Sequence, residues 1–270
     1  MSISVAAVQL KPQTSVDANL YSAAKLLDQA ADTGAQLAVL PENFAYYGQD
    51  LAQAGLAESD DQGPVRQFLR EQAVKLGIWL VAGTVPVAGA SSKPSARCYL
   101  LNPQGEMVNY YDKIHLFDVD LTTDGQTRRY RESDDFTAGK RVIAAPTDLA
   151  VLGMTVCYDL RFAELYRQLA KLDAQIISVP AAFTSATGKD HWQVLLRARA
   201  IENQVFVIGA NLVDRDNQRR GLWGGSCIID PWGNILSSMD DGVGVVMAEI
   251  DLDSIERLRA EMPVAEHHRL

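Results

Sequence analysis

Apolar residues recur along the chain in two patterns, one typical of buried strands and one typical of amphipathic helices. Short, almost wholly apolar runs at 5–10, 36–40 and 149–156 predict strands that are buried on both faces. Between the first two runs, residues 15–31 carry apolar positions three and four apart, the spacing of one helix face, and Ser15 stands at the N-cap position. The order strand, helix, strand predicts a parallel βαβ unit.

The second half of the chain repeats this layout. A helical pattern at 161–172 follows the run at 149–156, and a further predicted strand follows at 175–180. The two halves are therefore expected to be similar units of an α/β fold. No composition shift or linker separates them, so residues 1–270 are expected to form a single domain.

Weaker patterns complete the expected secondary structure. Residues 118–140 are polar without periodicity and are expected to form a long loop, whereas 181–188 reads as a short loop of small residues. A loop as long as the first is more often functional than idle. Further helices are predicted at 65–76, 191–204 and 252–261, and further strands at 78–87, 99–101, 107–111, 205–213, 226–230, 235–237 and 243–251.

Three residues that can carry chemistry lie where predicted strands end. Glu42, Lys113 and Cys157 each follow such a strand, and ligands of α/β folds bind beyond the carboxyl ends of strands. Each residue also has an ordinary interpretation, as an exposed loop carboxylate, a solvated charge and a small buried side chain, respectively. Position alone does not decide between the two interpretations.

Together, the three residues suit attack by a thiolate on a carbonyl or nitrile carbon. Glu42 can act as general base and acid if burial raises its pKa. Lys113 and the backbone N–H of Tyr158 can stabilise the oxyanion of a tetrahedral intermediate. Because Cys157 is placed where a strand turns into a helix, the helix dipole is also expected to lower its pKa.

Composition narrows the class of protein. Apolar residues make up 47% of the 270 residues, enough for a substantial core, and the formal charge of −9 argues against a nucleic-acid surface or docking on anionic lipid. The start MSISVAAVQL lacks a secretion signal, no apolar run reaches membrane-spanning length, and the three cysteines lack the spacing of a disulfide framework. We therefore expect a soluble cytoplasmic protein without nucleic-acid or membrane partners.

The candidate residues stand in three longer segments that belong together. LAVLPENF, YDKIHLFD and VCYDLRFAEL resemble, in this order, the signature segments of the nitrilase, or carbon–nitrogen hydrolase, superfamily. The resemblance implies a Glu–Lys–Cys triad at Glu42, Lys113 and Cys157. It also implies a second catalytic glutamate, which the motif RES assigns to Glu132. Finally, it implies a four-layer α-β-β-α sandwich that forms a homodimer and uses no cofactor.

Within the superfamily, KIHLFDVD, YRESD and DPWG look most like segments of the Nit-type amidases. This resemblance implies hydrolysis of the terminal amide of a small 2-oxo acid, with deaminated glutathione as the expected substrate, through a thioester on Cys157 and release of an amine or ammonia. The alternatives are an ω-amidase acting on 2-oxoglutaramate or 2-oxosuccinamate, a nitrilase or carbamoyl hydrolase, and a non-catalytic binding homologue. Two positions depart from the pattern, with Ala163 in place of proline and Gly225 in place of histidine.

Three further residues are candidates for contact with a substrate. Phe183 and Thr184 follow the predicted strand at 175–180 and are expected to shape the pocket for the acyl group. Arg161 lies close after the candidate nucleophile. It either forms an internal salt bridge or contacts a substrate carboxylate, and the sequence leaves both interpretations open.

Other candidate sites are less favoured. Arg197 and Arg199 lie on a predicted helix and are interpreted as parts of an ion-pair network rather than as substrate contacts. The histidines do not stand in the signature of a Cys–His protease, and the pair at 267–268 offers too few ligands for zinc, so no metal is expected. Cys98 and Cys227 are expected in the core, and no glycine-rich phosphate-binding motif is present.

Overall fold

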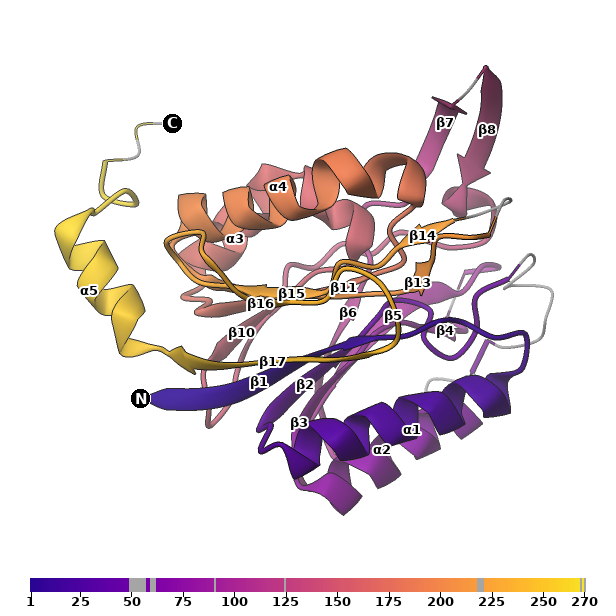
Figure 1. Ribbon diagram of the computed structural model, residues 1–270, viewed down its shortest axis with the longest axis horizontal. Coiled ribbons are helices and arrows are strands. Elements are labelled where there is room, and N and C mark those ends of the chain that lie inside the picture. Colours follow the sequence, from indigo (N-terminus) through magenta and orange to yellow (C-terminus); the bar gives the residue numbers. More distant parts are fainter. Residues whose placement is uncertain are drawn as a thin grey trace.

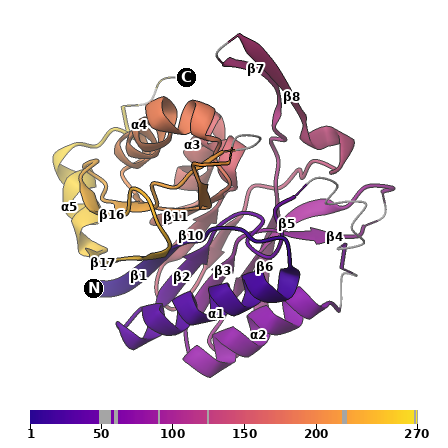
Figure 2. The same cartoon turned by 45° about the vertical axis from the view of Figure 1, so that its right-hand side comes forward.

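The computed structural model describes residues 1–48, 57, 58, 62–89, 91–123, 125–217, 221–267 and 269 of the chain. Two β-sheets pack face to face, and helices cover the outer face of each sheet (Figure 1). Helices α1 (Val16–Asp32) and α2 (Pro64–Leu76) lie on one side, α3 (Ala163–Lys171) and α4 (Ser185–Asn203) lie on the other, and α5 (Asp253–Glu261) lies at one end (Figure 2). The fold is thus the expected α/β sandwich of four layers, α-β-β-α.

The larger sheet has seven strands, and its central strands β1, β2 and β3 pair in parallel. Strands β17 and β5 pair antiparallel with the two outer members of this trio, and β6 pairs with β5. In order across the sheet, the strands are β17 (Gly244–Asp251), β1 (Ser2–Gln9), β2 (Leu37–Leu40), β3 (Trp79–Ala82), β5 (Ser95–Leu101) and β4 (Val85–Val87), with β6 (Met107–Asp112) beside β5.

The smaller sheet has six strands, of which β10, β11 and β12 run parallel. In order, they are β16 (Ile235–Ser238), β15 (Cys227–Ile229), β12 (Phe206–Asn211), β11 (Ile176–Ala181), β10 (Val151–Met154) and β9 (Ala144–Pro146). A separate ribbon is formed by β13 (Val213–Asp214) and β14 (Leu222–Trp223). Among the described residues, no helix is both long enough and apolar enough to cross a membrane.

Both predicted βαβ units are confirmed. Helix α1 connects the parallel strands β1 and β2, and helix α3 connects the parallel strands β10 and β11. Ser15 caps α1 as expected, because its side chain accepts the backbone N–H of Ala18. Each unit contributes its strands to a different sheet, so the two similar halves of the chain pack against each other.

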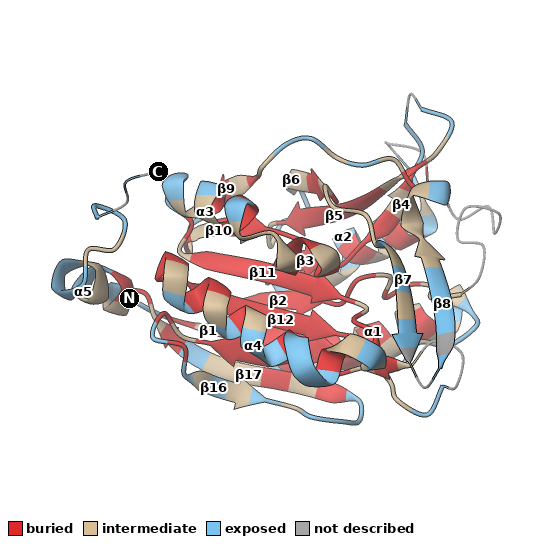
Figure 3. Ribbon diagram, turned by 90° about the horizontal axis from the view of Figure 1, so that it is seen from above, coloured by how far each residue is buried: buried red, intermediate tan, exposed pale blue. Residues whose placement is uncertain are grey.

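Strand β1 shows why the predicted strands are apolar throughout. Val5 and Ala7 belong to the hydrophobic core that includes the strands of the second sheet, whereas Ala6 and Val8 belong to the core beneath α1 and α2. All four side chains are fully buried. A strand between two apolar layers has no face toward water, so its residues do not alternate between polar and apolar. Figure 3 shows this burial along β11, β12 and β2.

The expectation of a long loop at 118–140 is wrong. Strands β7 (Asp118–Thr123) and β8 (Gln126–Arg131) form an antiparallel hairpin, and a 3₁₀ turn, η1 (Glu132–Asp134), follows. The hairpin projects away from the sandwich (Figure 2), so its strands carry none of the alternation that marks a half-buried strand. A salt bridge of 2.8 Å between Arg131 and Asp120 joins its two strands.

Helix α4 begins at Ser185, ahead of the predicted start at residue 191. Its first turn contains Gly188 and other small residues, which is why the sequence favoured a loop there. A Cβ atom on Gly188 would lie 2.3 Å from the Cβ of Trp223. The glycine therefore permits close packing of the helix against β14 and does not mark a loop.

The predicted strand at 78–87 is divided into β3 and β4 by a bend at Gly83. This glycine has a φ of +54°, and a Cβ on it would lie 2.0 Å from the carbonyl oxygen of Pro41. The adjacent Thr84 hydroxyl accepts the N–H of Asn43 at 2.9 Å. The bend thus packs directly against the turn that follows β2.

Replacing Gly83 with alanine is expected to destabilise the protein, because it combines an unfavourable φ with a collision at the Pro41 carbonyl. We expect the free energy of unfolding to fall by about 2–4 kcal/mol. Gly77→Ala is the matched control, since Gly77 also has a positive φ (+64°) but open space around a Cβ, and its expected cost is only about 1 kcal/mol. Urea unfolding compares the two variants, and equal losses would show that the contact with Pro41 is irrelevant.

Candidate active site

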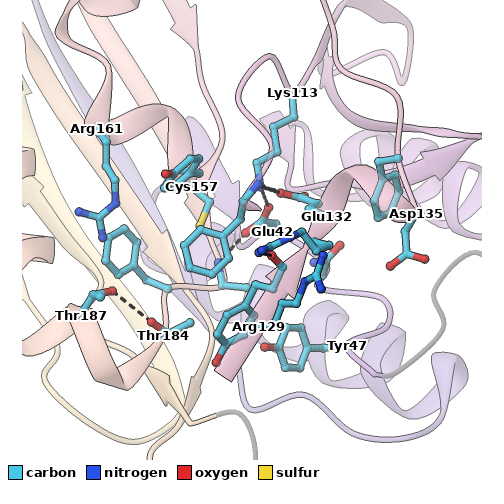
Figure 4. A pocket seen from close by; sticks show the side chains of 18 of the residues that line it. Glu42, Tyr47, Lys113, Arg129, Glu132, Asp135, Cys157, Arg161, Thr184 and Thr187 are labelled. Atoms are coloured by element: carbon cyan, nitrogen blue, oxygen red, sulfur yellow. Dashed lines mark hydrogen bonds and ion pairs between the residues drawn. The ribbon is translucent and has the colours of Figure 1, made fainter. Parts of the chain in front are cut away.

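A cavity of about 300 Å³ lies at the edge where strands of both sheets end (Figure 4). Glu42 follows β2, Lys113 directly follows β6, and Cys157 lies just after β10, so all three stand at strand ends as predicted. Strands β2 and β6 belong to the larger sheet, whereas β10 belongs to the smaller one. The packing of the two sheets therefore brings the acid and the amine against the thiol.

The ammonium group of Lys113 is held between two carboxylates. Its Nζ atom lies 2.7 Å from Glu42 Oε1 and 2.8 Å from Glu132 Oε2 (Figure 4), and only 2% of the side chain is exposed. The N–H of Ala182 donates to Glu42 Oε2 at 2.9 Å, and the N–H of Phe117 donates to Glu132 Oε2 at 2.6 Å. Lys113 also donates to Glu132 Oε1 at 2.9 Å, so every oxygen of both carboxylates accepts a hydrogen bond.

Burial and charge shift the pKa values within this cluster. Burial by itself would lower the pKa of Lys113, but Glu132 and Glu42 outweigh it and hold that pKa well above its ordinary value. Burial raises the pKa of Glu132, and the charge of Glu42 adds to this, while Lys113 partly offsets the rise. Lys113 is therefore a fixed cation at the bottom of the cavity.

Cys157 begins a short 3₁₀ helix, η2 (Cys157–Arg161), with a φ of +46°. This conformation is rare for a residue with a side chain and is maintained only by surrounding contacts. The thiol lines the cavity together with Glu42, and the charge of Glu42 acts on it. The turn thus presents the thiol to both the cavity and the carboxylate.

The expectation of a lowered thiol pKa is wrong. Burial raises the pKa of Cys157 well above its ordinary value, the charge of Glu42 raises it further, and the charge of Lys113 opposes this only in part. The short 3₁₀ helix η2 also lacks the long array of aligned peptide dipoles that the sequence argument assumed. The free protein therefore holds a protonated thiol at neutral pH.

A fully buried carboxylate, Asp159, holds the η2 turn in place. Its Oδ2 atom accepts the N–H of Val156 and the hydroxyl of Tyr111, both at 2.8 Å. Its Oδ1 atom lies 2.7 Å from Nδ1 of His115. Because Tyr111 and His115 flank Lys113, one carboxylate ties the lysine segment to the cysteine turn. Asp159 was not predicted as a site residue, because its only signal in the sequence is an acid two residues beyond the candidate nucleophile.

The other predicted site residues, Tyr158, Arg161, Phe183 and Thr184, also line the cavity. Nη1 of Arg161 lies 3.1 Å from Nδ1 of His191, and its guanidinium lies over the rings of Phe183 and Tyr158. Within the described residues, Arg161 forms no ion pair with a carboxylate, so the internal salt bridge considered from the sequence is absent there. Its positive charge faces the cavity.

Eleven residues of the cavity lining were not predicted as site residues. Three of them belong to strand β8, which was hidden by its interpretation as a loop, and the others lie within or close to the candidate segments and the loop before α4. They are Arg129, Tyr130 and Arg131 on β8, together with Asn43, Tyr47, Gly48, Phe117, Asp135, Phe136, Ala182 and Thr187.

The arginines of helix α4 lie outside the cavity lining. Nη1 of Arg199 lies 2.8 Å from Glu202 Oε1, and its Nε donates to the carbonyl of Leu160 at 3.0 Å. Nε of Arg197 donates to the carbonyl of Gly233 at 2.8 Å. The interpretation of Arg199 as part of an ion pair that braces the helix is confirmed, and it also supports the η2 turn.

In the part of the chain that the structure describes, no three His, Cys, Asp or Glu side chains cluster as metal ligands would. His267 belongs to this part, whereas His268 lies outside the described residues. Cys98 and Cys227 are fully buried in β5 and β15, as the sequence predicted.

The two departures from the family pattern fit their surroundings. Gly225 has a φ of +73°, which suits glycine, and its carbonyl accepts the indole N–H of Trp192 at 2.8 Å. Ala163 begins helix α3, which Phe162 separates from η2. Neither residue lines the cavity.

Comparison with known proteins identifies the family. The model of the carbon–nitrogen hydrolase family matches residues 4–260. A deaminated glutathione amidase of Yersinia enterocolitica is 40% identical over 240 residues, which cover 88% of this chain and 83% of the relative. A deaminated glutathione amidase of Synechocystis sp. (strain PCC 6803 / GT-S) is 40% identical over 266 residues, which cover 97% of this chain and 96% of the relative. The crystal structure of Saccharomyces cerevisiae Nit3, a member of branch 10 of the nitrilase superfamily, has a TM-score of 0.89 at 30% identity and covers 100% of this chain and 97% of that chain. The chain therefore belongs to the carbon–nitrogen hydrolase family.

Proposed function

We propose that this protein is an amidase that hydrolyses the amide of a small 2-oxo acid, with deaminated glutathione as its substrate. The observation that carries the proposal is a cavity that holds the Cys157 thiol together with Glu42, which shares the Lys113 ammonium with Glu132. Two relatives that are 40% identical to this chain are named deaminated glutathione amidase, which supports this choice of substrate.

In the acylation step, Glu42 removes the thiol proton as Cys157 attacks. Both groups line the same cavity and the charge of Glu42 acts on the thiol, so its carboxylate is the proposed acceptor of the proton. The sulfur forms a bond to the amide carbon, and the electron pair of the C=O bond moves to oxygen. The raised pKa of Cys157 makes this transfer necessary, because little thiolate is present beforehand.

The negative oxygen of the tetrahedral intermediate needs donors that are already in position. The proposed donors are the Lys113 ammonium, which points into the cavity, and the backbone N–H of Tyr158. Lys113 is kept charged by its two carboxylates, so it can donate without first gaining a proton. This arrangement lets Lys113 stabilise negative charge while Glu42 handles the proton.

Collapse of the intermediate breaks the C–N bond. Glu42 donates its proton to the leaving nitrogen, and a thioester remains on Cys157. Water then gives a proton to Glu42 and attacks the thioester carbon, the C–S bond breaks, and Glu42 returns this proton to the sulfur, which restores the thiol. Glu132 holds Lys113 from the side opposite Glu42 and is proposed to orient the leaving amine and the incoming water.

The acyl part of the substrate is proposed to lie along the wall formed by Arg161, Phe183 and Thr184. Arg161 carries a positive charge that no carboxylate of the described residues pairs with, which suits the carboxylate of a 2-oxo acid. Phe183 and Thr184 are nearly buried and narrow the cavity beside it. A cavity of about 300 Å³ is at the small end of ligand sites, as expected for such a metabolite.

The alternatives differ in substrate or in class. An ω-amidase acting on 2-oxoglutaramate or 2-oxosuccinamate would bind the acyl part of its substrate along the same three residues and release ammonia. A nitrilase or carbamoyl hydrolase would use the same thiol. A non-catalytic binding homologue is disfavoured, because a buried lysine between two carboxylates is costly to fold unless its charges serve a reaction.

The remaining proposals concern domain organisation, location and oligomeric state. We propose that the chain is one carbon–nitrogen hydrolase domain that acts in the cytoplasm without a cofactor. We also propose a homodimer formed through the helices of the smaller sheet. Exposed apolar side chains on α4 and on the neighbouring β15–β16 hairpin support this interface: Val194, Ile201, Trp232 and Leu236.

Formation of 2-oxoglutarate from deaminated glutathione and from 2-oxoglutaramate tests the substrate directly, because both release this product. We expect a higher kcat/KM for deaminated glutathione and a loss of roughly 10³-fold or more in Cys157→Ala. Cys227→Ala is the matched control, since that thiol is buried in β15 away from the cavity. Preference for 2-oxoglutaramate would indicate an ω-amidase, and turnover of neither would contradict the proposed substrate class.

The proposed role of Glu42 predicts opposite effects on thiol ionisation and on turnover. Because the Glu42 charge raises the pKa of Cys157, Glu42→Gln should lower this pKa and speed iodoacetamide labelling of Cys157 at neutral pH. Turnover should nevertheless fall by about 10²–10⁴-fold, because the base is lost. Lys113→Met should shift the pKa upward instead, since Lys113 lowers it. Slower labelling in Glu42→Gln would argue against this electrostatic assignment.

A further inference from the structure

The β7–β8 hairpin supplies part of the cavity wall that the proposed reaction does not use. It projects from the sandwich at the edge where the cavity lies (Figures 1 and 2), and Arg129, Tyr130 and Arg131 line the cavity from β8. The overall charge of the chain is −9, so cations at the cavity oppose the general charge of the protein. A cationic wall in an acidic protein indicates an anionic ligand.

The two arginines of this wall are held in different ways. Arg131 is committed to the hairpin itself, because it pairs with Asp120 at 2.8 Å and donates to the carbonyls of Val119 and Tyr130 at 3.1 and 2.6 Å. Arg129 is exposed and, within the described residues, has no hydrogen bond or ion pair. Asp120 stands opposite it in the hairpin register, but the carboxylate of Asp120 is bound by Arg131. The charge of Asp120 therefore acts on Arg129 from across the hairpin, but Arg129 can bind an anion without breaking a hydrogen bond or ion pair of the described residues.

The proposed reaction determines which end of the substrate reaches Arg129. The leaving nitrogen must lie near Glu42 and Glu132, and Glu132 directly follows the hairpin strand that carries Arg129. The acyl end must lie on the other side, along Arg161. Figure 4 shows Arg161 and Arg129 on opposite sides of Cys157. The leaving group therefore extends toward the hairpin.

We infer that Arg129 binds a carboxylate on the leaving-group side of the scissile amide and so selects peptide-like leaving groups over ammonia. This inference rests on the proposed function. In deaminated glutathione, 2-oxoglutarate is joined to cysteinylglycine, whose terminal carboxylate is two residues beyond the scissile nitrogen. Two extended residues span about 7 Å, a distance that crosses a cavity of this size toward its rim. Arg161 and Arg129 would then hold one carboxylate at each end of the substrate.

This arrangement explains how the same acyl-binding residues, Arg161, Phe183 and Thr184, can serve amidases that release ammonia and amidases that release a dipeptide. A 2-oxo acid amide that releases ammonia carries no carboxylate on the leaving side, so it gains nothing from Arg129. A dipeptide leaving group gains a charge-assisted hydrogen bond, which is worth about 10- to 100-fold in kcat/KM. Arg129 is therefore a specificity-determining residue, distinct from the groups that touch the reacting atoms.

The test compares deaminated glutathione with its glycine C-terminal amide, which differs only in lacking the charge. The measured quantity is the ratio of their kcat/KM values, with 2-oxoglutaramate as a third substrate. In the wild type, this ratio should be about 10 to 100, and Arg129→Met should bring it close to one, chiefly through KM. Arg129→Lys, which keeps the charge, should retain part of the preference. Arg128→Met, which removes the same charge from the same strand but from a residue outside the cavity lining, should keep the wild-type ratio.

The outcomes separate the inference from the proposed function. A wild-type ratio near one, or a ratio that Arg129→Met leaves high, would overturn the inference while deaminated glutathione remained the substrate. An equal loss of activity toward all three substrates would also overturn it, because it would indicate a structural role for Arg129. Turnover of none of them by the wild type would overturn the proposed function and the inference together.

Discussion

The site depends on one buried cation, the ammonium group of Lys113. A charge removed from water at 2% exposure is strongly unfavourable unless opposite charges and hydrogen bonds surround it. Glu42 and Glu132 supply both, and the Ala182 and Phe117 amides in turn hold the two carboxylates. These groups come from four separate segments of the chain, so the charge is stable only when both sheets and the base of the hairpin are assembled.

The surroundings of Cys157 have a chemical consequence. Burial and the charge of Glu42 oppose an anion on its sulfur and raise its pKa, and Lys113 offsets this rise only in part. The thiol therefore remains protonated and is ionised only as it attacks, with Glu42 as the acceptor. This differs from an ion-paired thiolate, which exists before the substrate arrives and is open to oxidation and alkylation at any time. Asp159 maintains the geometry of this transfer by joining the Cys157 turn to the lysine segment.

The sequence predicted those parts of the fold and site that depend on local pattern. Glu42 and Cys157 follow parallel strands that are apolar because they lie between two layers, whereas Lys113 follows the partly exposed strand β6 beside β5. The hairpin at 118–131 was missed because neither of its faces is buried, so it carries no periodic signal. The sign of the Cys157 pKa shift was missed because it depends on burial and on Glu42, which is remote in sequence. Gly188 was wrongly interpreted as part of a loop for a similar reason, since its close contact with Trp223 is made only in the folded protein.

The groups proposed to react and the residue proposed to select the substrate lie on different parts of the fold. The groups proposed to react lie on core strands or directly beyond them, where a change of side chain disturbs the balance of charge around Lys113. Arg129 lies on strands that pack against neither sheet, so its side chain can change without altering that balance. The hairpin is nevertheless anchored to the site, because the N–H of Phe117 at its base donates to the same Glu132 carboxylate that holds Lys113. A shift of the whole hairpin would thus move Glu132 and, with it, the groups around Lys113. A change of the side chain at position 129 would alter only which ligands the cavity binds.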